Sequence, residues 1–279
     1  MVLELIFFDI EHGSSVLIKT DTINMLFDLG MGDEKNPIDY INGDLNFLII
    51  SHPHLDHISG LAEMGERTPD TLLRNRSIPK KLIEESKDLS DNPTVIDAFN
   101  KYLKLNKKYN LPTPKESNPT NPNYNGGVDF INFSPNNDAE DLNYYSLAVF
   151  MEYEGVKILL MGDNTLSNIN ELLEDAEFKE RAKDIDIFLA PHHGRESCYS
   201  QDLMEHIKPK ITIISDKSDD NDNSAIDKYR SNTKGKIIIE KGNAKLRKCL
   251  TTRNDGDILV KIKDGFPYIS CWICYIRGC

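Results

Sequence analysis

Short apolar runs bounded by polar residues dominate the first fifty positions of the chain. Residues 3–9, 16–20, 24–28 and 45–51 are mostly apolar, and each run is too short for a typical helix. The pattern therefore predicts four β-strands. The run at 45–51 is apolar at nearly every position, which is typical of a strand that is covered on both faces.

Two segments with helical character follow. Proline stands at the start of residues 79–89 and 93–109, and proline fits the first turn of a helix, so the sequence predicts two helices there. Residues 112–127 contain four prolines and show no periodicity, which indicates a long loop. We interpret residues 67–127 as an insertion in a single domain, residues 1–279, and expect it to emerge close to the functional site.

The second half of the chain repeats the alternation of strands and helices. Apolar runs predict a hairpin of residues 147–153 and 156–161, and further strands at 185–189, 211–215, 236–240, 257–262 and 268–276. Helices are predicted at residues 165–183 and 225–230. Strands and helices that alternate in both halves predict an α/β fold with two sheets face to face and helices outside.

Composition and charge restrict the class of protein. The chain has 279 residues, of which 39% are hydrophobic and 28% charged, as in ordinary globular proteins. Its net charge of −12 argues against a protein that mainly coats nucleic acid. Residues 67–108 hold ten Lys/Arg against six Asp/Glu, so this segment is either a solvated helical surface or a patch that binds polyanions.

The sequence predicts a cytoplasmic protein without a membrane partner. No stretch approaches the roughly 18 apolar residues of a spanning helix, and the N-terminal residues lack the basic region of a signal peptide. The odd number of cysteines, five, argues against a disulfide framework. Cys271 and Cys274 form a lone C-x-x-C pair in an apolar tail, which favours buried thiols over a metal or redox site.

Histidine and aspartate are concentrated where the run at 45–51 ends. Three of the seven histidines fall within six residues and two more are adjacent in sequence: His52, His54 and His57, then His192 and His193. Imidazole and carboxylate are good ligands for zinc and similar ions. His52 and His54 can hold one ion, and Asp56 and His57, at the following turn, can hold a second.

These residues resemble the motifs of a known family. The string His52-x-His54-x-Asp56-His57 after an apolar strand is similar to the signature of the metallo-β-lactamase fold. Further segments match the motifs of that family in the same order: Phe27-Asp28-Leu29-Gly30, Met161-Gly162-Asp163 and Ala190-Pro191-His192-His193-Gly194. The resemblance spans residues 7 to about 215, apart from the insertion. It implies a four-layer αββα sandwich with a helical and loop insertion.

The resemblance also implies roles for single residues. His52 and His54 would bind the first metal. Asp56, His57 and His192 would bind the second. Asp163 would bridge both ions, and Asp28 would orient a ligand.

The candidate catalytic residues are Asp56, His193 and His12. His193 would contact the substrate, donate a proton, or pack against its neighbours. His12 is either a proton donor to the leaving group or a turn residue beside Gly13.

The sequence departs from the family pattern at the first metal. Many members supply a further histidine from the segment that corresponds to residues 143–146, and none is present here. The first site is therefore predicted to be poor in ligands and completed by water or substrate. Ser14 is a second departure. The branch that contains bacterial competence DNA-uptake proteins often has a glycine followed by an acidic residue near this position, so substrate contacts at that turn should differ.

The function implied is metal-dependent hydrolysis. Two divalent ions about 3.5–4 Å apart lower the pKa of water and neutralise charge on the attacked centre. We expect zinc, with manganese as the alternative. Residues 9–13 and 143–147 resemble the hydrolase domain of bacterial competence DNA-uptake proteins and phosphorylcholine esterases. This branch favours a phosphodiester substrate, including nucleic acid, and so a phosphodiesterase or nuclease.

Two other functions stay open at this point. One is a hydrolase of carboxyl esters, lactones or thioesters. The other is a non-catalytic, metal-binding regulatory module that works with a partner protein. The fold by itself does not decide among these substrates.

Overall fold

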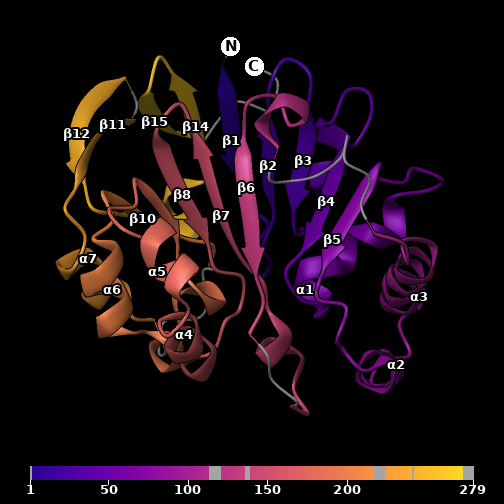
Figure 1. The fold of residues 1–279 in the computed structure, drawn as a ribbon. Coiled ribbons are helices and arrows are strands. Elements are labelled where there is room, and N and C mark those ends of the chain that lie inside the picture. Colours follow the sequence, from indigo (N-terminus) through magenta and orange to yellow (C-terminus); the bar gives the residue numbers. More distant parts are fainter. Residues whose placement is uncertain (1, 113–120, 136–138, 217–223, 241, 273–279) are drawn as a thin grey trace.

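The computed structural model describes residues 2–112, 121–135, 139–216, 224–240 and 242–272. Within these residues the chain forms two β-sheets that face each other, with helices on the outer side of both (Figure 1). No helix among them is long and apolar enough to cross a membrane.

The larger sheet has nine described strands and the smaller has six. In spatial order the larger sheet contains β12 (Asn243–Arg247), β11 (Lys236–Glu240), β15 (Phe266–Trp272), β14 (Asp257–Lys263), β1 (Leu3–Phe7), β2 (Val16–Lys19), β3 (Asn24–Phe27), β4 (Phe47–Ile50) and β5 (Thr71–Arg74). The smaller sheet contains β13 (Cys249–Thr251), β10 (Ile211–Ile214), β9 (Ile187–Leu189), β8 (Val156–Leu160), β7 (Ala148–Tyr153) and β6 (Asp129–Phe133).

Three separate hydrophobic cores define the layers. The first lies between the sheets, where Phe27, Ile49 and Val260 of the larger sheet meet Phe130 and Ile213 of the smaller. Alternation along the strands produces this core, because successive side chains point to opposite faces. The outward-facing side chains of β1 to β5 form a second core, and those of the smaller sheet form a third.

Helices cover both outer cores. The larger sheet is covered by α1 (Leu55–Ile58), α2 (Lys80–Asp88) and α3 (Pro93–Lys108). The smaller sheet is covered by α4 (Leu166–Leu172), α5 (Ala176–Arg181), α6 (Gln201–Ile207) and α7 (Ile226–Ser231), and α8 (Thr252–Asp255) follows β13. The predicted four-layer αββα arrangement is confirmed.

The predicted helix at residues 165–183 is wrong in one respect. It is divided into α4 and α5, because the Asp175 side chain accepts a hydrogen bond from the Phe178 amide and so begins a second helix. Sequence analysis also missed β5, β6, β12 and β13. These strands are three to five residues long, and β12 shows no apolar alternation because most of its residues are exposed.

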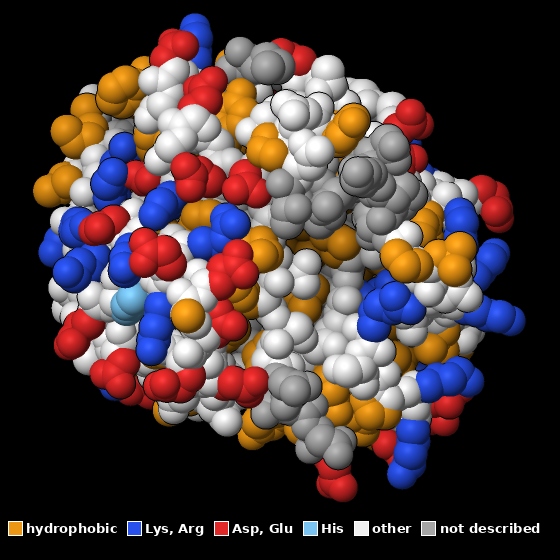
Figure 2. Space-filling view, viewed as in Figure 1, with side chains coloured by type: hydrophobic (Ala, Val, Ile, Leu, Met, Phe, Trp, Pro, Cys, Tyr) orange, Lys and Arg blue, Asp and Glu red, His pale blue; other side chains and the backbone are white. Residues whose placement is uncertain are grey.

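Residues 67–127 are integrated into the sandwich as far as the structure describes them. Strand β5 pairs in parallel with β4, and both helices predicted here are confirmed as α2 and α3, which pack on the larger sheet. Lys and Arg side chains gather on the right-hand side of Figure 2, where Figure 1 places these helices. Part of the long loop, residues 113–120, lies outside the described residues, as do Cys274 and Cys279.

Candidate metal centre

The predicted site residues follow the carboxyl ends of strands in both sheets. Asp28 follows β3, residues 52–57 follow β4, Asp163 follows β8, and His192 and His193 follow β9. Strand β3 is parallel to β4, and β8 is parallel to β9. Parallel strands bring their carboxyl ends to one edge of a sheet, where ligand sites of such sheets form. The fold therefore collects side chains that are more than 100 positions apart.

Four side chains form the tightest group. Asp56, His57, Asp163 and His193 each bring one potential ligand atom within 4.8 Å of the others. The Nε2 atom of His57 lies 3.2 Å from Asp163 Oδ1 and 3.5 Å from Asp56 Oδ2. The Nε2 atom of His193 lies 3.0 Å from Asp56 Oδ2 and 3.7 Å from Asp163 Oδ2.

This group fits a divalent metal ion. His57 Nε2 is buried and makes no hydrogen bond of acceptable geometry, although Asp163 Oδ1 is near it. A buried polar atom without a partner is costly, and a metal ion would remove that cost. Two imidazoles and two carboxylates are also donors that zinc and related ions accept.

The carboxylate of Asp28 orients His57 from behind. Asp28 is fully buried, and its Oδ2 lies 2.7 Å from His57 Nδ1. The hydroxyl and amide of Ser51 donate to the same carboxylate, at 2.9 and 2.7 Å. A proton held on Nδ1 leaves Nε2 free to face the metal position. This arrangement supports the orienting role expected for Asp28.

The same carboxylates control the charge of His57. Burial by itself would lower the pKa of His57, but Asp163, Asp56 and Asp28 together raise it well above its ordinary value. Burial raises the pKa of Asp28 against the effect of His57. The pKa of Asp163 is held well below its usual range, since His57 and His193 outweigh the effect of burial. The carboxylates therefore favour a positive charge within the group, which suits a cation.

A strained turn places the two adjacent histidines. His192, His193 and Gly194 have φ angles of 48°, 54° and 70°, a region in which residues other than glycine are strained. The Nδ1 atom of His193 lies 2.9 Å from the Ser215 carbonyl oxygen, so Nε2 points to Asp56.

The sequence predicted that His192 binds the second metal together with Asp56 and His57. The tight group instead contains His193, whose Nε2 lies near the carboxylates of Asp56 and Asp163. His192 is nevertheless in the site: its Nε2 lies 3.7 Å from Asp163 Oδ2 and its Nδ1 lies 3.3 Å from Cys198 Sγ. Nothing in the sequence indicated Cys198, whose thiol is buried beside this imidazole.

The residues predicted for a first metal lie next to this group. His52 Nε2 is 2.9 Å from His54 Nδ1 and 3.9 Å from Asp163 Oδ2. The Ser51 hydroxyl lies 3.1 Å from His52 Nδ1, which turns His52 Nε2 toward His54. Burial, with His57 adding to it, lowers the pKa of His52 well below its ordinary value. His52 is therefore neutral and able to bind a cation.

His12 belongs to the site as well. It comes from the connection between β1 and β2, and its side chain is 43% exposed. Its ring stacks on His193 with a centroid distance of 5.1 Å, and its Nε2 lies 3.8 Å from Asp56 Oδ2. His12 is thus the most exposed imidazole of the group, in a position to meet a substrate.

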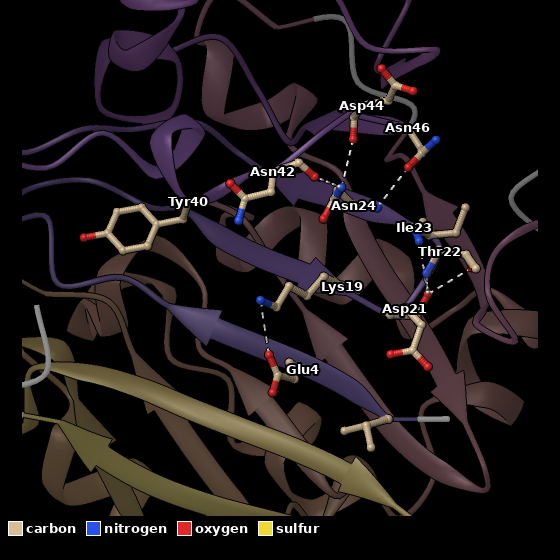
Figure 3. Close-up of a pocket in the computed structure, with 12 residues that line it drawn as sticks. Glu4, Lys19, Asp21, Thr22, Ile23, Asn24, Tyr40, Asn42, Asp44 and Asn46 are labelled. Atoms are coloured by element: carbon tan, nitrogen blue, oxygen red, sulfur yellow. Dashed lines mark hydrogen bonds and ion pairs between the residues drawn. The ribbon is translucent and has the colours of Figure 1, made fainter.

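A larger surface hollow lies elsewhere and holds none of these residues. It has a volume of about 480 Å³ and is lined mainly by polar residues around β1 to β3, including Glu4, Lys19, Tyr40 and Asn46 (Figure 3). Several of its polar groups already bond to one another: Asn24 donates to the carbonyl oxygen of Asp44, and Lys19 pairs with Glu4. Its lining contains no histidine or cysteine. The group at the strand ends is therefore the better candidate for a metal site.

Fold and site together define a metallohydrolase-type αββα sandwich. The Metallo-beta-lactamase superfamily matches residues 9–215, and the chain belongs to this superfamily. The chain is similar in fold to Igni18, a metallo hydrolase from the archaeon Ignicoccus hospitalis, with 13% identity, 76% of this chain and 82% of that chain covered, and a TM-score of 0.45. It is also similar to the metallo-beta-lactamase fold protein YhfI from Bacillus subtilis, with 12% identity, 75% and 85% coverage and a TM-score of 0.42. A comparison with curated proteins found no relative.

Proposed function

We propose that the protein is a metal-dependent phosphodiesterase. The observation that carries the proposal is the position of Asp163, whose carboxylate lies within 4 Å of His52, His57, His192 and His193. One carboxylate between two groups of imidazoles suits a pair of ions. When bound, such a pair supplies an activated water and neutralises charge on both sides of an in-line displacement, which fits a phosphodiester with its two non-bridging oxygens.

The residues of the chain itself have distinct tasks in this proposal. Asp163 holds the two halves of the site together, and Asp28 keeps the Nε2 of His57 directed into it. His12 donates a proton to the leaving group, because its imidazole is the most exposed in the site and is stacked on His193. His193 belongs to the group that would hold a metal ion, which leaves His12 as the proton donor.

Nucleic acid is the natural phosphodiester to test. The resemblance of residues 9–13 and 143–147 to the competence-protein branch supports it, whereas the net charge of −12 argues for a small or locally steered substrate. The basic residues of segment 67–108, ten Lys/Arg against six Asp/Glu, are the part of the chain that could attract a polyanion.

The experiment is metal analysis followed by a substrate screen. The purified full chain, loaded with Zn²⁺ or Mn²⁺, is assayed with bis(4-nitrophenyl) phosphate, single-stranded DNA, a lactone and a thioester. We expect turnover of the phosphodiesters, abolished in Asp163→Asn, which also controls for contaminating enzymes. Turnover of the lactone or thioester alone would replace the proposal with a carboxyl-ester hydrolase. Metal binding without turnover of any substrate would favour a regulatory module.

A further inference from the structure

We propose that the side-chain amide oxygen of Asn143 is a ligand of the first metal ion, completing a site that the sequence leaves without a third histidine. The inference rests on the metal centre of the proposed function and deepens it. Residue type alone would not suggest this role, because zinc sites prefer imidazole and thiolate ligands over the asparagine amide. The contacts of the Asn143 side chain are what support it.

Neighbouring donor atoms of the first site lie slightly closer together than the ligands of one bound ion. His52 Nε2 lies 2.9 Å from His54 Nδ1, and His54 Nδ1 lies 3.1 Å from Asn143 Oδ1. Ligand atoms about 2.0–2.2 Å from a tetrahedral ion are roughly 3.3–3.6 Å apart. Asp163 Oδ2, at 3.9 Å from His52 Nε2, is the fourth donor of the set.

The position of Asn143 is held from both sides. Its backbone amide donates to the Asp141 side chain at 2.8 Å, and its carbonyl oxygen accepts from Asn168 Nδ2 at 3.2 Å. Ser146, three residues later, accepts a hydrogen bond on its hydroxyl oxygen from the Asp163 amide. The turn that carries Asn143 is therefore tied to the strand end that carries Asp163, which keeps the amide oxygen directed at His54.

The ligand set changes which metal the first site prefers. Two imidazole nitrogens and two oxygens replace the three nitrogens and one oxygen that a third histidine would provide. Amide and carboxylate oxygens suit Mn²⁺ and similar ions, whereas imidazole favours Zn²⁺. Compared with a site of three histidines, the site with Asn143 gives up part of its preference for Zn²⁺ over Mn²⁺.

The alternative is that Asn143 only orients His54 through a hydrogen bond. Loss of an orienting partner weakens metal binding by about 10–100-fold. Since no donor atom to the metal would change, we expect Zn²⁺ and Mn²⁺ to be weakened by similar factors. A ligand role predicts instead that the affinity ratio of the two metals changes with the donor atom at position 143.

The test is Mn²⁺ binding by electron paramagnetic resonance and Zn²⁺ binding by chelator competition, with the full chain and no substrate. We expect two Mn²⁺ per wild-type chain. Asn143→Ala should weaken only the first ion, by at least about 10-fold. Asn143→Asp should retain both ions, and Asn143→His should shift the ratio of affinities at least about 10-fold toward Zn²⁺. The exposed amide substitution Asn123→Ala is the matched control and should match wild type.

Three results would be decisive against the inference. The first is an Asn143→Ala variant that binds both ions as tightly as wild type. The second is an Asn143→Ala variant whose affinities for Zn²⁺ and Mn²⁺ fall by the same factor. The third is an Asn143→His variant with an unchanged ratio of affinities for the two metals. Retention of the second ion in each variant shows that the fold is intact. A wild-type chain that binds no metal would instead overturn the proposed function itself.

Discussion

At the scale of single residues, the carboxylates at the strand ends have unequal tasks. Asp163 faces four imidazoles, whereas Asp28 reaches the centre only through His57 and Ser51. We predict that Asp28→Asn lowers kcat/KM by about 10–100-fold, as loss of an orienting partner does. Asp163→Asn should lower it further, because both halves of the site lose a shared negative ligand.

Steady-state kinetics with a small phosphodiester, together with metal content, measures this difference. The exposed substitution Asp184→Asn serves as the matched control, since Asp184 pairs with Lys234 at the surface. Equal activity of the Asp28 and Asp163 variants would contradict a shared ligand at position 163.

The half-exposed imidazole of His12 gives a second prediction at this scale. If His12 protonates the leaving group, His12→Gln should slow phosphodiesters with alkyl leaving groups by about 10²–10⁴-fold, the usual contribution of a general acid. Esters with a 4-nitrophenyl leaving group need no proton and should be much less affected. The measurement is a comparison of kcat for both ester types at matched metal content. A uniform loss for both would remove the role in protonation and leave a role in binding.

Among the structural elements, the turns that follow the strands determine how closely neighbouring segments pack at the site. Gly162 follows β8 with a φ angle of 51°, and a Cβ there would lie 2.5 Å from Ser146 Oγ and 2.7 Å from Ser51 Cβ. Gly155, in the β7–β8 hairpin, has a φ angle of 77° but an open surrounding. Alanine is strained at both positions because of the positive φ angle. The difference in the free energy of unfolding between the two alanine variants therefore measures the effect of crowding.

We predict that Gly162→Ala lowers the free energy of unfolding by about 1–3 kcal/mol more than Gly155→Ala, the usual cost of overpacking. Urea unfolding of both variants measures it. Equal losses would mean that the turn after β8 can move away from Ser51 without cost.

The basic residues of segment 67–108 are the second feature of the molecule to consider here. Several of these charged side chains already have partners within the protein. Arg74 and Arg76 donate to oxygen atoms of residues 106, 109 and 110, and Lys80 pairs with Glu84. Lys104 and Lys107 are exposed on α3 and, within the described residues, have no acidic partner within salt-bridge distance.

We predict that Lys104→Gln combined with Lys107→Gln slows cleavage of long DNA several-fold at low salt, while turnover of bis(4-nitrophenyl) phosphate is unchanged. Exposed charges act over about 10 Å at 0.1 M salt, so the difference should fade as salt rises. Kinetics across a salt series tests this. Unchanged rates on both substrates would make residues 67–127 structural and favour a small-molecule substrate.

At the scale of the whole molecule, the metal centre joins the two sheets. Asp28 and Asp56 follow strands of the larger sheet, and Asp163 and His193 follow strands of the smaller. The carboxylates of Asp56 and Asp163 face each other across the site, and their negative charges repel without a cation. We predict that removal of metal by a chelator lowers the free energy of unfolding. Saturation at about 100 times Kd contributes about 2.7 kcal/mol per site. Thermal unfolding with and without metal measures the shift, and Asp163→Asn should show a smaller one. An identical melting temperature in both conditions would contradict a site within the native fold.

Much of the fold was predictable because apolar patterns are local. The runs at 3–9, 45–51 and 147–161 became β1, β4 and the β7–β8 hairpin, and the two proline-led helices became α2 and α3. Strands such as β12, which is almost fully exposed, were missed because their pairing with a neighbour rather than their own side chains makes them strands.

The composition of the site can be read from local sequence: the spacing of His52, His54, Asp56 and His57 and the two later motifs identify a metal-binding hydrolase fold. Which atoms meet depends on the three-dimensional packing. It put His193 rather than His192 into the group around Asp56, where the Ser215 carbonyl oxygen holds Nδ1 and Nε2 faces Asp56. It also brought Asn143 to His54, 89 positions away in the chain. Such contacts depend on strand pairing and packing across the two sheets, which no local pattern encodes.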